Sequence, residues 1–456
     1  MEKFFKLKEN HTDVKTEVLA GLTTFMTMAY ILAVNPGILS VTGMDGGAVF
    51  TATALASAIA SFCMGVFANL PFALSAGMGL NAYFAFTVVL QMGYPWEVAL
   101  AAVFVEGIIF LILSLTKVRE AIFNAIPGTL KVAVSVGIGL FICFIGLQSS
   151  GIVAANESTL VSLFSLKGSL MTGSFHTAGI TVILAILGVV ITWILLQKNV
   201  KGNILIGILI TWVLGIICEA VGFYVPNPDQ GFFSVIPTTL VSMPASMAPT
   251  FGKCFDGFKM IGNIGDFLVV MFAFLFVDMF DTLGTLIGCA SKANMLDKDG
   301  KLPGIKGALL ADSVGTTVGS VFGTSTVTTF VESSSGIAEG GRTGLTAITT
   351  GVLFILALFL SPLFLAIPAF ATAPALIVVG FLMVQQVGKI AWNDLTEAIP
   401  AFVTIVAMPF TYSISEGIAL GILTFVIMNL FGGRRKNITP LMYILAVLFL
   451  AKYFII

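Results

Sequence analysis

The segment Thr-Ser-Thr-Val-Thr-Thr-Phe-Val-Glu-Ser-Ser-Ser (324–335) determines how the rest of the chain is interpreted. Eight of its twelve residues are Ser or Thr, which makes it too polar for a helix that faces lipid. Its β-branched residues precede a Glu-Ser-Ser-Ser-Gly cluster, so we expect a short extended piece that turns into a half-helix. Such backbone is tolerated at membrane depth only where it is buried in protein or lines a water-filled cavity.

A second abnormal segment is Leu-Ser-Ala-Gly-Met-Gly-Leu-Asn-Ala-Tyr-Phe-Ala-Phe (74–86). Small residues occupy its first half, and aromatic residues with one amide occupy its second half. If both segments form half-helices, their N-termini direct free N–H groups and positive dipole ends at a common centre. The alternative is that both are short polar spans whose small residues serve close packing.

The composition around these segments is that of a polytopic membrane protein. Of the 456 residues, 57% are hydrophobic and 10% are charged, whereas a soluble globular protein carries about 25% charged residues. This excludes a soluble enzyme, a nucleic-acid-binding protein and a disordered scaffold. The five cysteines show no CxxC spacing, and the two histidines, His11 and His176, lie outside the apolar segments.

Apolar runs of the length that a bilayer requires, about 20 residues, recur along the chain. The first series is predicted at 18–39, 49–69, 74–91, 97–116, 126–147, 178–196 and 203–223. The second series is predicted at 264–289, 303–322, 325–338, 343–366, 374–388, 397–411 and 414–431. A further apolar stretch, 438–455, follows a basic loop, and the sequence leaves open whether it crosses the membrane.

The basic residues predict the orientation, because cytoplasmic loops carry an excess of Lys and Arg. A cytoplasmic N-terminus places most of the basic loop residues inside, including Lys117, Arg119, Lys198, Lys201, Lys298, Lys301 and the run 434–436. This assignment requires a break between 397–411 and 414–431, which we expect at Met408-Pro409-Phe410. Because seven is odd, a duplicated seven-span unit has to insert in opposite orientations, an arrangement typical of transporters.

Three carboxylates lie inside the predicted spans. Asp278 and Asp281 are three residues apart on one helix face, and Glu332 lies in the polar segment. A carboxylate at the bilayer centre costs about 2.5–3.5 kcal/mol on insertion scales, so such residues mark functional cavities. Desolvation favours their protonated form, which makes them a candidate proton-coupling site. Neighbouring threonines offer a purely structural alternative, and the single acids Glu106, Glu219, Asp312, Glu397 and Glu416 are less informative.

Several of these motifs together resemble the AzgA-like purine permeases of the nucleobase–cation symporter-2 superfamily. The resemblance is carried by Gly-Met-Gly-Leu-Asn-Ala-Tyr-Phe (77–84), Val-Asp-Met-Phe-Asp-Thr-Leu-Gly-Thr (277–285) and Thr-Thr-Phe-Val-Glu-Ser-Ser-Ser-Gly-Ile (328–337). Glu-Gly-Gly-Arg-Thr-Gly (339–344) and Glu-Ala-Ile-Pro-Ala-Phe (397–402) match as well. The resemblance covers essentially the whole chain.

The resemblance implies an all-α polytopic membrane protein with fourteen spans, arranged as two inverted seven-span repeats with broken helices in the third and tenth spans. It implies a core domain and a gate domain that move past each other. The expected division is a cytoplasmic N-terminus (1–16), a core domain (17–120 and 263–368), a gate domain (121–262 and 369–431) and a C-terminal basic loop with an extra apolar helix (432–456).

The family's site residues are carried over position by position. Glu332 is expected to be the main ligand carboxylate and Asp281 a second one, with Asn81 in the polar role of the third span. The other expected substrate contacts are Phe330, Val331, Phe84, Thr329 and Ser333, and Phe280 is a further candidate for stacking. Ser333 departs from the Asn of the ascorbate, uracil and urate branch. Asp278, Asp281 and Glu332 are the candidates for proton coupling, with the order Asp281 for binding and Asp278 for the proton.

We therefore expect a multi-pass transporter of the bacterial inner membrane that imports purine bases, guanine or hypoxanthine first, and that is not an enzyme. We expect the proton gradient rather than sodium to drive it, with no cofactor or metal and no nucleic-acid partner. A related-fold carrier of small anions and a passive channel are the alternatives; a membrane-embedded hydrolase would need a histidine dyad or a metal cluster. The sequence leaves open which purine is preferred and whether the protein forms a homodimer.

Overall fold

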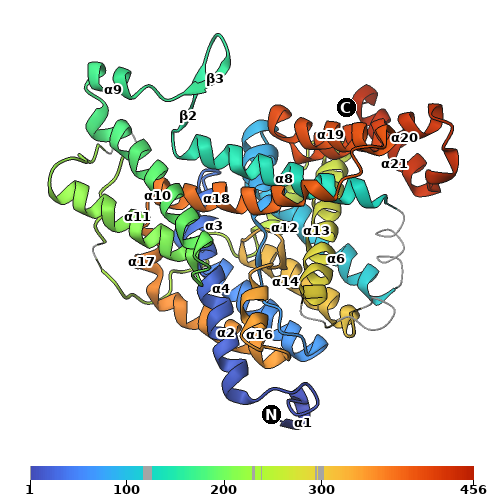
Figure 1. Ribbon diagram of the computed structural model, residues 1–456, viewed down its shortest axis with the longest axis horizontal. Helices are drawn as coiled ribbons and strands as arrows, with labels where there is room; N and C mark the ends of the chain where they lie inside the picture. Colours follow the sequence, from blue (N-terminus) through green and yellow to red (C-terminus); the bar gives the residue numbers. More distant parts are fainter. Residues whose placement is uncertain are drawn as a thin grey trace.

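The computed structural model describes residues 2–116, 126–227, 232–237, 239–292, 295 and 302–455, most of which lie in helices (Figure 1). The predicted inner-loop residues Lys117, Arg119, Lys298 and Lys301 lie outside these described residues. Within the described part, ten helical segments are long and apolar enough to cross a membrane. These are Val14–Ser40, Gly46–Ala68, Trp96–Leu115, Gly128–Ser149, Phe175–Gln197, Asn203–Ala220, Ile264–Leu286, Gly344–Leu365, Ala369–Lys389 and Ile414–Phe431.

The first half of the chain contains the elements of the first predicted series. They are α1 (Glu2–Phe5), α2 (Val14–Met28), α3 (Ile31–Ser40), α4 (Gly46–Cys63), η1 (Met64–Ala68), β1 (Leu74–Ala76), α5 (Met78–Ala82), η2 (Tyr83–Gln91), α6 (Trp96–Leu115), α8 (Gly128–Ser149), α10 (Ile180–Gln197) and α11 (Asn203–Ala220). Side-chain caps set two of the helix starts. Asp13 accepts a hydrogen bond from the Thr16 N–H at 2.9 Å, and Asp45 accepts one from the Ala48 N–H at 2.7 Å.

The second half contains the elements of the second series. They are α13 (Ile264–Lys292), α14 (Ile305–Phe322), β4 (Val327–Thr329), α15 (Ser333–Ala338), α16 (Gly344–Ala357), α17 (Ser361–Leu365), α18 (Ala369–Val384), α19 (Leu395–Thr411) and α20 (Ile414–Phe431). The predicted division between α19 and α20 is present, but Met408-Pro409-Phe410 lies within α19 rather than at the break. The chain turns at Tyr412, which has a left-handed backbone with φ of 56°, and Ser413 caps α20.

The two abnormal segments meet at the centre of the molecule. β1 pairs with β4 in an antiparallel two-stranded ribbon in which Ser75 lies opposite Thr328, and both strands are fully buried. Each strand leads into a short helix, α5 after β1 and α15 after β4. Outer strand edges need partners, and the Thr316 hydroxyl supplies them to Val327 by donating to its carbonyl (3.0 Å) and accepting from its N–H (3.2 Å). The expectation of an extended piece that turns into a half-helix at 324–335 is confirmed.

Contacts between helices of the first and the second series occur in matching pairs, in which each helix is replaced by its counterpart in the other series. α6 packs against α14, and the corresponding pair α16 and α4 pack in the same way. α10 packs against α18, and the corresponding pair α19 and α8 do so as well. Glycines allow these close approaches, since a Cβ added at Gly107 of α6 would lie 2.5 Å from Thr317 and one at Gly351 of α16 would lie 2.6 Å from Phe62. Such exchange is the pattern that an inverted repeat produces.

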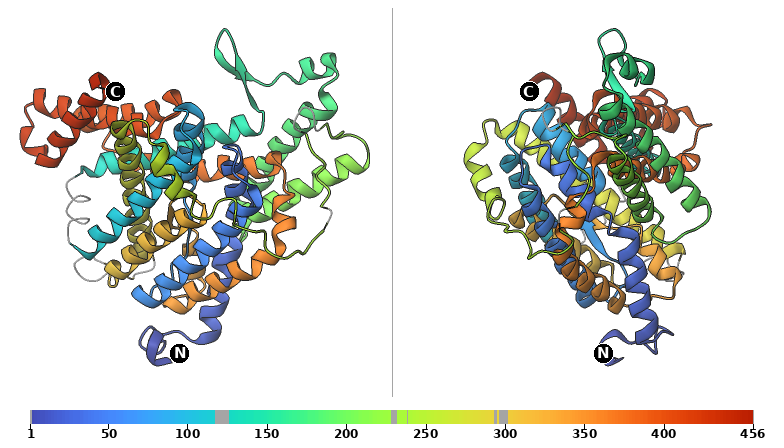
Figure 2. Two further views of the ribbon diagram at one scale, coloured as in Figure 1. Left: turned by 180° about the vertical axis from the view of Figure 1, so that it is seen from behind. Right: turned by 90° about the vertical axis from the view of Figure 1, so that its left-hand side faces the viewer.

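Two outer connections and the C-terminal helix complete the chain. β2 (Val153–Asn156) and β3 (Leu160–Leu163) form a hairpin that projects from the helical body, followed by α9 (Leu166–Thr172) (Figure 2). The second connection contains α12 (Lys253–Gly257) and is tied to α11 by Glu219, which accepts from the Ser234 hydroxyl (2.6 Å) and the Val235 N–H (2.8 Å). α21 (Pro440–Ile455) packs against α20, and its Phe449 ring lies 6.0 Å from that of Phe272 in α13.

Candidate functional site

The candidate site lies where α13 and the break between α2 and α3 face the end of β4. Glu332 immediately precedes α15, and its Oε1 accepts a hydrogen bond of 2.7 Å from the Tyr30 hydroxyl. Asp281 projects from α13 to the same place, where the Thr328 hydroxyl hydrogen-bonds to it. As whole residues, Glu332 and Asp281 are each partly exposed.

A second pair of carboxylates lies deeper in the protein. Asp278 of α13 and Asp312 of α14 are both fully buried, and the Thr282 hydroxyl lies between them at 3.1 Å and 2.7 Å from their Oδ1 atoms. A hydroxyl has one proton to donate, so the second contact is a hydrogen bond when that carboxyl group carries a proton and donates it. The pair can therefore hold a proton out of contact with the ligand space. Sequence reasoning undervalued Asp312, which lies in the middle of α14 rather than in a first turn.

The predicted contacts on the first broken segment lie at the other end of β4. Asn81 of α5 is buried, and the Ser325 hydroxyl donates to its amide oxygen, whereas its Nδ2 has no partner among the described residues. Phe84 is fully buried, and its ring packs edge-on against Phe274 of α13. Thr329 of β4 is likewise buried, and its hydroxyl has no partner within the described part of the chain. Asn81 and Thr329 thus carry unused hydrogen-bonding capacity.

Two other predicted residues, Ser333 and Phe330, form hydrogen bonds with the backbone of Ala73. The Ser333 hydroxyl accepts from the Ala73 N–H at 3.0 Å, and the Phe330 N–H donates to the Ala73 carbonyl at the same distance. These bonds hold β1 against the beginning of α15. The Val331 side chain is 52% exposed, so only its backbone faces the packed interior. The side chain of Phe280 lies outside the described residues.

Sequence reasoning missed two further partners of the polar segment. Tyr30 is only 1% exposed and comes directly before α3, where an aromatic residue in an apolar run gives no signal of function. Glu106 of α6 is fully buried, and its Oε2 accepts a 2.8 Å hydrogen bond from the Thr326 hydroxyl. An acid within an apolar span was the available signal for Glu106, but its partner is 220 residues away in the sequence.

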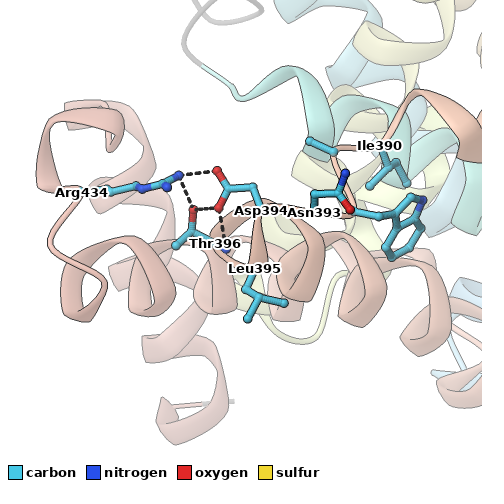
Figure 3. Close-up of a pocket in the computed structure, with 8 residues that line it drawn as sticks. Ile390, Asn393, Asp394, Leu395, Thr396 and Arg434 are labelled. Atoms are coloured by element: carbon cyan, nitrogen blue, oxygen red, sulfur yellow. Dashed lines mark hydrogen bonds and ion pairs between the residues drawn. The ribbon is translucent and has the colours of Figure 1, made fainter.

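A cavity at the start of α19 is separate from these carboxylates. It has a volume of about 700 Å³ and is lined by residues 390–396 and Arg434, at the start of α19 (Figure 3). Arg434 pairs there with Asp394, whose Oδ1 accepts from the Thr396 hydroxyl at 2.8 Å. The hydrogen bonds from Thr396 and Arg434 hold the pKa of the Asp394 carboxyl below its usual value. Because these groups already satisfy one another at an exposed helix end, we take the carboxylates around β4 as the candidate site.

Known proteins that are similar to this chain are permeases. A family model described as a permease family matches residues 15–420. The guanine/hypoxanthine permease PbuG of Bacillus subtilis is 47% identical over 464 residues, covering 100% of this chain and 99% of PbuG. The adenine permease AdeP of Escherichia coli is 44% identical over 453 residues, covering 99% of this chain and 95% of AdeP. The chain belongs to this permease family.

The family membership confirms the resemblance that the motifs predicted, and it makes the chain a transporter rather than an enzyme. Solved structures agree on the fold. The transmembrane domain of the cyanobacterial bicarbonate transporter BicA superimposes with a TM-score of 0.61 over 89% of this chain and 97% of that chain. Its sequence is 16% identical, so this similarity concerns the fold alone.

Proposed function

We propose that this permease imports purine nucleobases by proton-coupled alternating access, with guanine or hypoxanthine as substrate. The observation that supports this most directly is the pair of partly exposed carboxylates, Glu332 and Asp281, beside the β1–β4 ribbon. Purines are flat, neutral molecules with several N–H donors, and a carboxylate is an acceptor-only group that suits such donors. PbuG is named as a guanine/hypoxanthine permease, and adenine is the second candidate because AdeP is named as an adenine permease.

We assign different roles to the partly exposed and to the fully buried carboxylates. Glu332 and Asp281 accept purine N–H groups, while the buried pair of Asp278 and Asp312 carries the proton across. The unused amide N–H of Asn81 offers a donor to a purine ring nitrogen or carbonyl. An anion carrier is disfavoured, because the carboxylates of Glu332 and Asp281 at the site repel an anion.

The proposed architecture has fourteen crossings with a cytoplasmic N-terminus. The ten long helices are joined by α14, α19 and the two broken segments, β1–α5–η2 and β4–α15. The core domain comprises residues 17–120 and 263–368, and the gate domain comprises 121–262 and 369–431. The packing supports this division, since α14 contacts α6 and α4 and α16 contacts α4, while α8 contacts α18 and α19 and α10 contacts α18.

The decisive experiment measures uptake of radiolabelled hypoxanthine and its competition by guanine, adenine, xanthine and uracil. We expect purines to compete and uracil not to, and a protonophore to abolish accumulation. Glu332→Ala should abolish uptake, because an unpaired donor in a desolvated site costs about 1–3 kcal/mol, or roughly ten- to a hundredfold in affinity. Glu97→Ala, which removes a glutamate from the first turn of α6, is the matched control. Wild-type affinity in Glu332→Ala would exclude this site.

A further inference from the structure

The Tyr30 hydroxyl donates to the Glu332 carboxylate, and neither the motifs nor the relatives' names assign Tyr30 a role. We propose that Tyr30 is a positioning residue: its hydroxyl binds one oxygen of Glu332 and thereby leaves the other oxygen directed at the purine. The inference rests on the proposed function, since it requires Glu332 to be the ligand carboxylate. It adds Tyr30 to the proposed site, and it specifies which carboxylate oxygen of Glu332 binds the substrate.

The backbone around Tyr30 holds it in this position. α2 ends at Met28 and α3 begins at Ile31, so the helix is interrupted where the Tyr30 side chain meets Glu332. The Thr27 hydroxyl lies 3.4 Å from the Glu332 carbonyl oxygen, one turn before Tyr30. These contacts tie the end of α2 to the residue that precedes α15.

The same span is fixed at the other end of the polar segment. Asn35 of α3 donates from Nδ2 to Thr324 at 2.9 Å and to Thr53 at 2.7 Å. Tyr30 and α3 therefore contact both ends of the polar segment, Thr324 at its beginning and Glu332 near its end. These bonds hold the backbone on both sides of Tyr30, and the Tyr30 side chain between them is buried.

The hydrogen-bond chemistry of the pair gives a test that packing alone cannot imitate. The hydroxyl proton is donated to Oε1 of Glu332 at 2.7 Å. A carboxylate has two equivalent acceptor oxygens, so Oε2 is left for the ligand. A glutamine has one oxygen and one NH₂ group. In Glu332→Gln the hydroxyl captures the amide oxygen, and the NH₂ group then faces the purine N–H, donor against donor.

Removing the hydroxyl therefore has opposite effects in the two backgrounds. In the wild type, Tyr30→Phe frees the Glu332 carboxylate and lowers purine affinity. In Glu332→Gln, the additional Tyr30→Phe change lets the amide rotate and present its oxygen to the purine, so affinity rises. A merely structural tyrosine would lower affinity in both backgrounds.

The experiment compares the wild type, Tyr30→Phe, Glu332→Gln and the double variant as purified full-length proteins, with hypoxanthine and guanine Kd values measured by calorimetry. KM and Vmax for uptake into proteoliposomes give an independent readout. We expect Tyr30→Phe to raise Kd about tenfold with Vmax retained, and the double variant to bind about tenfold more tightly than Glu332→Gln, since one misplaced buried partner is worth about 1–3 kcal/mol. Tyr83→Phe, at another tyrosine that is 1% exposed, should not improve Glu332→Gln.

The outcomes separate this inference from the proposed function. Affinities that fall in Glu332→Gln but are not restored in the double variant would overturn the role of Tyr30 and leave Glu332 as the ligand carboxylate. Unchanged affinity in Glu332→Gln would overturn the proposed site itself. If Glu332→Gln does not reach the membrane, the comparison of Tyr30→Phe with Tyr83→Phe decides, since the inference requires the Kd to rise in the first variant only.

Discussion

Glu17 and Glu332 are two glutamates inside the same group of helices, and they differ in how many hydrogen bonds the protein supplies. The fully buried Glu17 carboxylate accepts from the N–H groups of Arg342 (2.8 Å), Thr343 (3.3 Å) and Thr346 (3.2 Å), and from the Thr346 hydroxyl (2.6 Å). Glu332 accepts one recorded side-chain bond, from Tyr30. A carboxylate saturated by its own protein is structural, and one with unused acceptor capacity is available to a ligand.

The donors to Glu17 come from the turn that leads into α16. The N–H groups at the start of a helix lack the usual partners within the helix. The Glu17 carboxylate of α2 lies at the start of α16, where the helix dipole favours an acidic group. The Asn69 amide oxygen adds a partner for the Gly344 N–H at 2.9 Å. The Arg342 guanidinium donates to the Ile337 carbonyl at 2.7 Å and so closes the end of α15. The motif 339–344 thus forms a turn before α16, and Glu17 is its main partner.

The largest effect is expected at Glu17. Glu17→Ala removes the recorded acceptor of the Arg342 and Thr343 N–H groups, at about 1–3 kcal/mol for each buried group that stays unsatisfied. It also removes the carboxylate contacts of Thr346, which keeps weaker backbone acceptors. We expect a large loss of folded protein in the membrane, measured as the monodisperse fraction after detergent extraction and as the unfolding temperature. Thr346→Val removes one donor and is the graded control. If Glu17→Ala folds normally but loses purine binding, the division between structural and ligand glutamates is wrong.

The two broken segments and the carboxylates could be located from the sequence, but the residues that contact them could not be predicted from it. Composition identified 324–335, because eight Ser and Thr residues cannot face lipid. Tyr30 and Glu17 escaped notice because their partners are 302 and 325 residues away, and neither a Tyr in an apolar run nor a Glu at a helix start is unusual. Val331 is exposed because the chain turns just before α15, and the residue pattern does not predict that turn.

A smaller and more selective effect is expected at the α13 carboxylates. Asp281→Asn should weaken purine binding, since Asp281 is partly exposed beside Glu332. Asp278→Asn should retain binding and counterflow exchange but lose pH-driven accumulation, because Asp278 is buried with Thr282 and Asp312. Binding is measured by calorimetry and accumulation in proteoliposomes with an imposed pH gradient. Thr282→Val, which removes the bridging hydroxyl, should resemble Asp278→Asn. The reverse pattern would exchange the two roles.

The smallest effect is expected at Glu339, a third glutamate that differs from both others because it is near the surface. It caps the end of α15, the helix that Glu332 precedes, and its side chain is 22% exposed. It pairs with Lys201, 57% exposed, on the loop between α10 and α11, and so joins the two groups of helices that we assign to core and gate. Exposed ion pairs contribute about 0–1 kcal/mol, so breaking this one should change the balance between conformations by at most about fivefold.

The charges at this pair can be exchanged without altering the substrate site. Lys201→Glu and Glu339→Lys should each change the Vmax of uptake by up to about fivefold and leave the purine Kd unchanged, because the Coulomb attraction between core and gate is lost in one conformation. The double swap restores opposite charges and should return Vmax towards the wild-type value, and the effect should diminish at high salt as the charges are screened. Lys198→Glu, on the same loop, controls for the change in net charge. If the double swap is no better than either single variant, the ion pair does not link transport to the relative position of the two groups, and Glu339 serves only as the cap of α15.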